Sequence, residues 1–281
     1  MTDRRHFLAA MGAAAALAGC APLGRSARKA HVVVVGGGFG GATAAKYLRL
    51  WSDGSVRVTL VERNAQFISC PMSNLVIGGA QSMSHITHDY AGLRDAHGVR
   101  VVHDSVTAID PRAREVRLAS GERLRYDRLL LSPGIDFLPE AIEGLVGHED
   151  RIPHAWKAGE QTALLPRQLA AMPEDGVFAI HIPKAPFRCP PGPYERASLV
   201  ADYCRRHKPR AKVLVLDDNA DIQSKKGLFT AAWAQHYRDI IEYRPNNQLL
   251  AGDAATRTAV LEFDEVKADV LNVIPPQRAG H

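Results

Sequence analysis

Cysteine is scarce in this sequence and is not arranged as a metal site or a disulfide framework. The 281 residues include four cysteines, and no two of them form a CxxC pair. Their spacings match neither a zinc-binding pattern nor the dense pairing of a small secreted domain. We therefore predict no metal centre and expect each thiol to react, or simply to pack, on its own. The four positions are Cys20, Cys70, Cys189 and Cys204.

A concentrated block of one charge is also missing. Lysine and arginine total 35 against 30 aspartate and glutamate, which gives a formal net charge of +5, and the basic residues are scattered. Proteins that bind nucleic acids usually gather such residues into a stripe or patch, so we exclude nucleic acid as a partner. A weakly basic face can still help to dock an acidic partner or to hold an anionic substrate.

No apolar run near the N-terminus is long enough to anchor the chain in a membrane. Residues 9–19 form a short, alanine-rich run that directly follows the Arg4-Arg5 segment. This order predicts a twin-arginine export signal over residues 1–30 and a periplasmic location. Cys20 ends a lipoprotein-like sequence, so lipidation of Cys20 and cleavage a few residues later are alternative processing events. Only lipidation would place the protein at a membrane.

The sequence does contain the glycine pattern of a dinucleotide-binding turn. A β-branched run, His31–Val35, predicts a strand buried on both faces, and GxGxxG follows at once. Gly36 allows the tight turn, Gly38 lets peptide N–H groups approach a pyrophosphate, and Gly41 lets the following helix pack on the strand. Glu62 ends the next predicted strand. It would accept a hydrogen bond from a ribose hydroxyl, which argues against a 2′-phosphate and hence against NADP.

A second strand–helix–strand unit follows, but its turn has a different composition. Residues 176–182 and 212–217 predict strands, and residues 195–206 predict the helix between them. The connecting stretch carries prolines in place of the glycine pattern, and proline has no N–H to offer a phosphate. We therefore predict that this unit does not bind NAD(P)H.

Together these elements predict an α/β protein of two Rossmann-like, three-layer domains with parallel central sheets. The first, which would bind FAD, comprises residues 31–145 and 268–281, because the chain is expected to return to it near its end. The second comprises residues 146–267 and lacks the glycine pattern. Short strands at 99–104, 108–110 and 115–118 are expected to form a β-meander inserted in the first domain.

Four segments resemble the flavin subunit of flavocytochrome c sulfide dehydrogenase. The longest and most unusual is Pro186–Ala197, and the similarity runs from about His31 to the last residue. The resemblance implies FAD as the cofactor and oxidation of sulfide to sulfur or polysulfide. It also implies transfer of electrons to a cytochrome c subunit, which carries the haem. The other three segments are Phe67–Asn74, His154–Thr162 and Ile274–Gly280.

The same resemblance implies roles for three residues. Cys70 would be the thiol bonded to the flavin 8α position, Cys189 one half of a redox-active disulfide, and Glu195 an acid/base near that disulfide. The residues alone leave other roles open. Cys70 could pack as a small buried side chain, and Glu195 could merely cap its helix. Cys204 is expected to be inert packing in the same helix.

The family pattern continues past the last residue of this sequence, with the second redox cysteine and a C-terminal interface domain. We therefore expect the interface domain to be absent and the FAD domain to be incomplete. Two further functions stay open at this point. One is that of a sulfide:quinone reductase, and the other is that of a non-catalytic FAD-binding accessory protein of sulfur oxidation.

Overall fold

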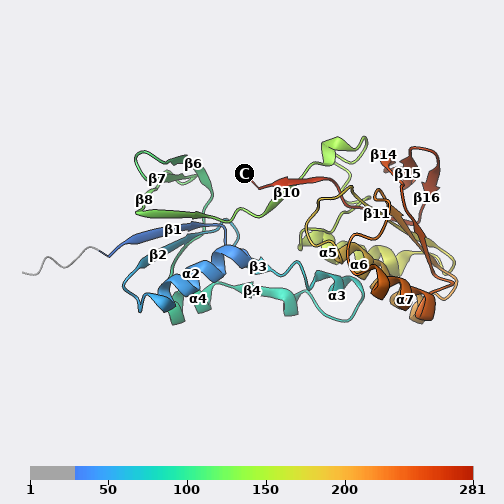
Figure 1. Cartoon of the computed structure of the whole chain (residues 1–281), viewed down its shortest axis with the longest axis horizontal. Helices are drawn as coiled ribbons and strands as arrows, with labels where there is room; N and C mark the ends of the chain where they lie inside the picture. Colours follow the sequence, from blue (N-terminus) through green and yellow to red (C-terminus); the bar gives the residue numbers. More distant parts are fainter. Residues whose placement is uncertain (1–28, 281) are drawn as a thin grey trace, which may run out of the picture.

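A computed structural model describes residues 29–280 and shows two α/β units side by side (Figure 1). In each unit a parallel sheet lies between helices on one face and a small antiparallel sheet on the other. The prediction of two Rossmann-like, three-layer units is confirmed. Almost all of the predicted export signal, including Cys20, lies outside the described residues. No helix among residues 29–280 is both long and apolar enough to cross a membrane.

The first unit is built on a four-stranded parallel sheet of order β5-β2-β1-β9. Alternate residues of β1 face opposite ways, as the two-residue period of a strand requires. Val32 and Val34 pack toward Ala45 of α2, whereas Val33 packs toward Val116 of the antiparallel sheet. The elements are β1 (His31–Val35), β2 (Arg57–Val61), β5 (Arg100–Val102), β9 (Arg128–Leu131), α2 (Phe39–Trp51), α4 (Ala91–His97), β6 (Val106–Asp110), β7 (Glu115–Leu118) and β8 (Arg123–Arg125).

One expectation for this unit is wrong. Residues 99–104 were expected to begin the β-meander, but β5 pairs in parallel with β2 and forms the edge of the main sheet. The three-stranded antiparallel sheet is made by β6, β7 and β8 instead. Val99 is buried against the helices that cover the sheet, so its apolar character belongs to this edge of the parallel layer.

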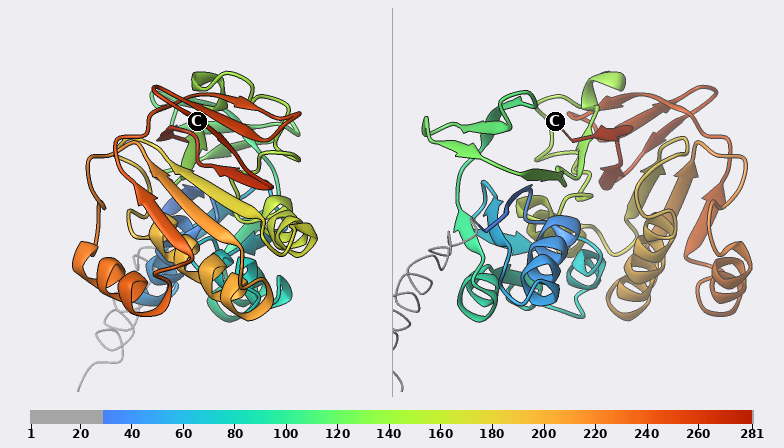
Figure 2. Two further views of the ribbon diagram at one scale, coloured as in Figure 1. Left: turned by 90° about the vertical axis from the view of Figure 1, so that its right-hand side faces the viewer. Right: turned by 60° about the vertical axis from the view of Figure 1, so that its left-hand side comes forward.

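The second unit repeats this plan with a sheet of order β13-β12-β11-β17. Seen from its end, the sheet lies between a helical layer and a second antiparallel sheet (Figure 2). Ile180 of β11 packs toward the helices, and its neighbour Ala179 packs toward the antiparallel sheet. The elements are β11 (Val177–Ile182), β12 (Lys212–Asp217), β13 (Ile241–Arg244), β17 (Val270–Val273), α5 (Glu160–Ala171), α6 (Gly192–His207), α7 (Lys226–His236), β14 (Leu249–Asp253), β15 (Thr258–Leu261) and β16 (Glu265–Lys267).

The domain boundary near the end of the chain lies later than residue 268. The strand β17 pairs in parallel with β11, so it completes the second sheet and does not return to the first unit. Asn272 and the apolar residues around it are buried there, which fixes the strand in that layer. The return begins only at β18 (Gln277–Ala279), which pairs antiparallel with β10 (Ile135–Phe137).

A second crossing joins the units through a short helix. The helix α3 (Ser73–Ile77) follows β3 (Gln66–Ile68) of the first unit but packs against α5 and α6 of the second. It therefore brings Cys70, which immediately precedes it, to the boundary between the units. The remaining short elements are η1 (Ser84–Ile86), β4 (Thr87–Asp89), which pairs with β3, and η2 (Pro139–Ala141).

Candidate active site

The three glycines of the first turn have different roles, two in the fold and one beside an open space. Gly36 has a φ of 95°, and a Cβ on it would lie 2.2 Å from the backbone oxygen of Ser132. A Cβ on Gly41 would lie 1.8 Å from the backbone oxygen of Gly36. These two positions therefore need glycine for the fold itself. Around Gly38 a Cβ would meet no protein atom within 4 Å, so the turn leaves an open space there.

The open space adjoins the N-terminus of α2. Gly38 is the N-cap residue, and no side chain caps the helix. The first N–H groups of a helix have no partner within the helix, and the helix dipole places partial positive charge there. Free N–H groups, a local positive potential and room for a backbone approach are what a pyrophosphate requires.

Glu62 is held beside this turn, as the sequence predicts. One carboxylate oxygen accepts a hydrogen bond from the N–H of Gly37 at 2.7 Å, and the other accepts from Asn64. Tyr90 covers the other side and donates its hydroxyl to the Gly37 oxygen. Burial, followed by the charge of Glu62, raises the pKa of Tyr90 to about 12, so the hydroxyl stays protonated. The turn therefore fits a dinucleotide such as FAD.

Cys70 lies at the boundary of the two units and is half-buried. Its sulfur lies 3.1 Å from the carbonyl oxygen of Trp156, to which the thiol donates, and 3.1 Å from Nη2 of Arg188. The same Arg188 nitrogen also donates to the Trp156 oxygen. Thus a thiol from the first unit meets a guanidinium from the turn of the second.

Cys189 lies next to Arg188 in the same turn and is exposed. Its φ is 59°, a conformation that non-glycine residues rarely adopt. Its sulfur lies against the first turn of α6, because a Cβ on Gly192 would lie 3.2 Å from it. Partial desolvation of its sulfur raises the pKa of the Cys189 thiol, and the charges of Glu195 and Cys70 add to the rise, whereas the Gly192 N–H and Arg188 oppose it.

The position of Glu195 is set by Asn74, and its charge contributes to the raised pKa of Cys189. The Asn74 side chain donates to the Glu195 carboxylate at 2.8 Å and to the Gly192 oxygen at 3.1 Å. Because Asn74 belongs to α3, the helix that follows Cys70 orients the carboxylate beside Cys189. Glu195 is itself exposed. The predicted residues Cys70, Cys189 and Glu195 are therefore brought together, while Cys204 is fully buried in α6.

Arg196 ties this region to the core. It is 1% exposed, and its guanidinium donates to the side-chain oxygens of Asn74 and Asn272. It also donates to the carbonyls of His154 and Ala155, and it lies 4.8 Å from the centre of the Trp156 ring. Arg196 makes no ion pair with a carboxylate within the described residues, although the charge of Glu195 acts in its favour. Burial, followed by the charges of Arg196, Lys157 and Arg188, lowers the pKa of His154 to about 4.

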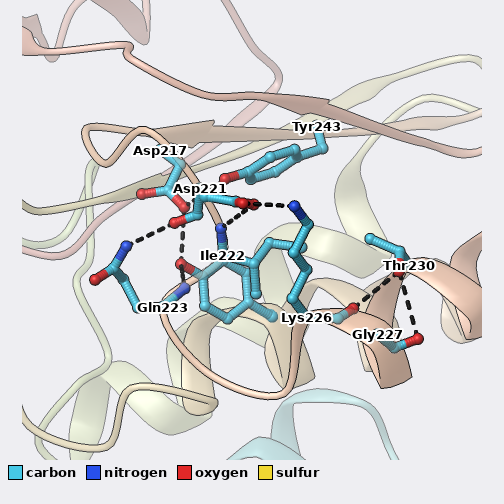
Figure 3. A network of polar contacts seen from close by, with 9 residues as sticks. Asp217, Asp221, Ile222, Gln223, Lys226, Gly227, Thr230 and Tyr243 are labelled. Atoms are coloured by element: carbon cyan, nitrogen blue, oxygen red, sulfur yellow. Dashed lines mark hydrogen bonds and ion pairs between the residues drawn. The ribbon is translucent and has the colours of Figure 1, made fainter.

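The turn of the second unit is filled by the protein's own side chains. Asp217 ends β12, the place where a dinucleotide site would hold a ribose, and it is fully buried. Its carboxylate accepts hydrogen bonds from the hydroxyls of Tyr194 and Tyr243 and from Asn219. Figure 3 shows Tyr243 beside Asp217, with the neighbouring Asp221 paired to Lys226.

The start of α6 is also unsuited to a phosphate. Pro193 and the acidic Glu195 lie in the first turn of α6, where a phosphate would need N–H groups and positive potential.

Several residues of the site carried no signal as single positions. Arg188, Arg196, Asn74 and Trp156 lie inside segments that resemble the family, yet nothing in the sequence indicated that they contact one another. The contacts span 118 residues between Cys70 and Arg188 and 122 between Asn74 and Arg196. Residues 29–280 contain no group of three or more histidine, cysteine or acidic side chains placed to hold a metal ion.

The sequence matches two protein-family models and a curated flavoprotein. Residues 162–275 match the family model "Sulfide dehydrogenase [flavocytochrome c] flavoprotein chain, central", and residues 30–165 match "Pyridine nucleotide-disulphide oxidoreductase". A stretch of 46 residues is 64% identical to the sulfide dehydrogenase (flavocytochrome c) flavoprotein chain of Chlorobaculum thiosulfatiphilum. It covers 16% of this chain and 94% of that sequence. The chain belongs to this flavoprotein family.

Relatives of this flavoprotein include sulfide:quinone oxidoreductases. The mitochondrial enzyme of Dictyostelium discoideum is 25% identical over 262 residues, which cover 87% of this chain and 56% of the relative. The crystal structure of the sulfide:quinone oxidoreductase of Aquifex aeolicus superposes with a TM-score of 0.72 at 22% identity. That match covers 88% of this chain and 58% of the other, and it confirms the fold. This flavoprotein thus spans little more than half the length of these two relatives.

Proposed function

We propose that this flavoprotein uses FAD to oxidise sulfide to sulfur or polysulfide and passes the electrons to a cytochrome c subunit in the periplasm. The observation that carries the proposal is the meeting of Cys70 and Cys189 at Arg188. Sulfur chemistry at a flavin needs thiols beside the ring, and here two thiols from different units lie at one boundary. The family matches support the same substrate class.

The residues of the first unit would bind and orient the cofactor. The free N–H groups at the start of α2 would hold the pyrophosphate, with Gly38 providing the room, and Glu62 would hold the ribose. FAD supplies the acceptance of an electron pair and its release as single electrons. Cys70 would hold the flavin covalently, as the family resemblance implies.

At the boundary of the units, Cys189 and Glu195 would handle the substrate. The exposed Cys189 thiol is accessible to a small inorganic sulfur species. The Glu195 carboxylate, held by Asn74, would accept or return the proton that a sulfide or a thiol exchanges. The weakly basic balance of the chain supports the binding of an anionic substrate.

Periplasmic export and the cytochrome partner rest on separate support. The Arg4-Arg5 motif with its apolar run supports export, and the name of the Chlorobaculum relative supports a cytochrome c acceptor. A quinone acceptor is the second candidate. It is favoured by the similarity to sulfide:quinone oxidoreductases over most of the chain.

An anaerobic titration with sulfide tests the proposal. We expect the flavin absorbance at about 450 nm to bleach, and added cytochrome c to become reduced as the colour returns. Colour restored by a soluble quinone and not by cytochrome c would transfer the assignment to the second candidate. A bound flavin that sulfide never bleaches would overturn the redox function and favour a non-catalytic accessory role.

A further inference from the structure

Arg188 is held in place through its backbone and through its guanidinium. Its backbone N–H donates to the side chain of Gln277 at 2.9 Å, and its backbone oxygen accepts from the Trp156 indole N–H at 3.3 Å. Its guanidinium reaches back to the Trp156 carbonyl. Three contacts from two segments thus fix this cation against Cys70, and Cys189 is its neighbour in the sequence.

The two thiols share this cation unequally. The sulfur of Cys70 receives a direct hydrogen bond from Arg188 at 3.1 Å. No hydrogen bond from the guanidinium to Cys189 is found in the described residues, and Glu195 places negative charge near that thiol. A cation that donates to sulfur favours the thiolate, which is the nucleophilic form, and so opposes the hydrogen bond that the neutral Cys70 thiol donates to Trp156. Nearby negative charge has the opposite effect.

We propose that Arg188 is a positioning residue that makes Cys70 the stronger nucleophile of the two thiols, although Cys70 is the more buried. The inference rests on the proposed function, because it explains how the thiol assigned to flavin attachment differs from the thiol assigned to the substrate. Exposure alone predicts the reverse order, with the exposed Cys189 reacting first.

Alkylation of the full-length, flavin-free chain with iodoacetamide at pH 7 measures this order directly. In the reaction the thiolate sulfur displaces iodide and forms a carbon–sulfur bond, so the rate follows the population of thiolate and its accessibility. Mass spectrometry of the peptides that contain Cys70, Cys189 and Cys204 gives three rates in one sample. Cys204 is fully buried, and burial raises its pKa to about 11, so it reports whether the protein stays folded.

In the wild-type chain we expect Cys70 to react several-fold faster than Cys189. Arg188→Gln should slow Cys70 about ten-fold, reversing the order, whereas Arg188→Lys should keep most of the Cys70 rate. Arg117→Gln, an exposed arginine on β7, is the matched control and should change nothing. The proposal is overturned if Cys189 reacts first in the wild type, or if Arg188→Gln leaves Cys70 unchanged while Cys204 stays protected.

The wild-type order keeps the proposal testable even if Arg188→Gln fails to fold, which reaction of Cys204 would reveal. A separate measurement addresses the proposed function. Acid precipitation of the flavin-loaded wild-type protein should leave the yellow colour in the pellet if flavin is bonded to Cys70. Free flavin in the supernatant would refute that bond without affecting the reactivity order, so the two failures are distinguishable.

Discussion

The two units share one architecture but differ at the turn where a nucleotide would bind. In the first, Gly38 leaves open space in front of an uncapped helix, and Glu62 lies beside this turn, just after the next strand. In the second, prolines replace the glycines, and the equivalent acid, Asp217, is occupied by two tyrosine hydroxyls and an asparagine. A strand–helix–strand frame therefore does not by itself make a cofactor site. The composition of its turn decides.

The largest effect should come from the residue that joins the two units. Arg196→Met would leave the side-chain oxygens of Asn74 and Asn272 and the Ala155 carbonyl without the donor that Arg196 provides, and the His154 carbonyl would keep only Asn272. We expect a loss of about 3–5 kcal/mol in the free energy of unfolding. Urea unfolding measures it. Arg205→Met on the same helix removes only an exposed ion pair and should change the stability far less. Equal losses for the two variants would show that the hydrogen bonds of Arg196 do not stabilise the fold.

Two alanine substitutions separate the fold of the first turn from its binding capacity. Gly41→Ala places a Cβ against the Gly36 oxygen and should lower thermal stability strongly. Gly38→Ala meets no protein atom, so the melting temperature of the flavin-free chain should change little, while FAD affinity falls about ten-fold or more. Thermal unfolding of the flavin-free variants measures their stability, and fluorescence titration with FAD measures the affinity. Unchanged FAD affinity in Gly38→Ala would remove this turn from the binding site.

The filled turn of the second unit can be probed at Tyr194. Tyr194→Phe removes the hydroxyl that donates to Asp217 at 2.7 Å and accepts from the Gln223 N–H at 3.1 Å. We expect a loss of about 1–3 kcal/mol in unfolding free energy, because the Asp217 carboxylate is fully buried and would lose one of its donors. Tyr203→Phe is the control on the same helix, since the Tyr203 hydroxyl makes no hydrogen bond in the described region. If the two variants are equally stable, the hydroxyl network does not hold this turn.

Two buried histidines extend the comparison to pH. His31 in the first unit hydrogen-bonds through both ring nitrogens, to Arg125 and Thr59, whereas neither ring nitrogen of His181 has a partner with good hydrogen-bond geometry among residues 29–280. Burial lowers the pKa of His181 to about 4, with a small opposing effect from the Asn247 backbone. The unfolded chain therefore binds protons first as the pH falls below about 6.5.

Because the folded pKa is depressed, the stabilisation is complete above pH 6.5 and is lost as the pH falls toward 4. We expect His181 to cost about 1 kcal/mol of stability between pH 7 and pH 5.5. His181→Leu should flatten that part of the slope while leaving the contribution of His154, which titrates in the same window. Urea unfolding at the two pH values measures the difference, and a slope that is the same in both proteins would contradict the assignment.

Much of the frame follows from local patterns in the sequence. The run of valines in β1, the glycines after it and the following helix lie next to one another in the chain. Their structure depends on nearby residues and could therefore be predicted from the sequence. The positions of β5 and β17 were misassigned because a short apolar strand does not reveal which sheet it joins. Arg188 and Arg196 could not be placed at all, since their partners lie more than 100 residues away and only the folded chain brings them together.

Only the first unit offers an open dinucleotide-binding turn within the described residues, and we expect it to take FAD. Equilibrium titration of the purified wild-type chain with FAD, and separately with NADH, tests it most directly. We expect saturation at about one FAD per chain and no saturable binding of NADH. Saturable NADH binding that survives Gly38→Ala, or a chain that takes up no FAD at all, would contradict it.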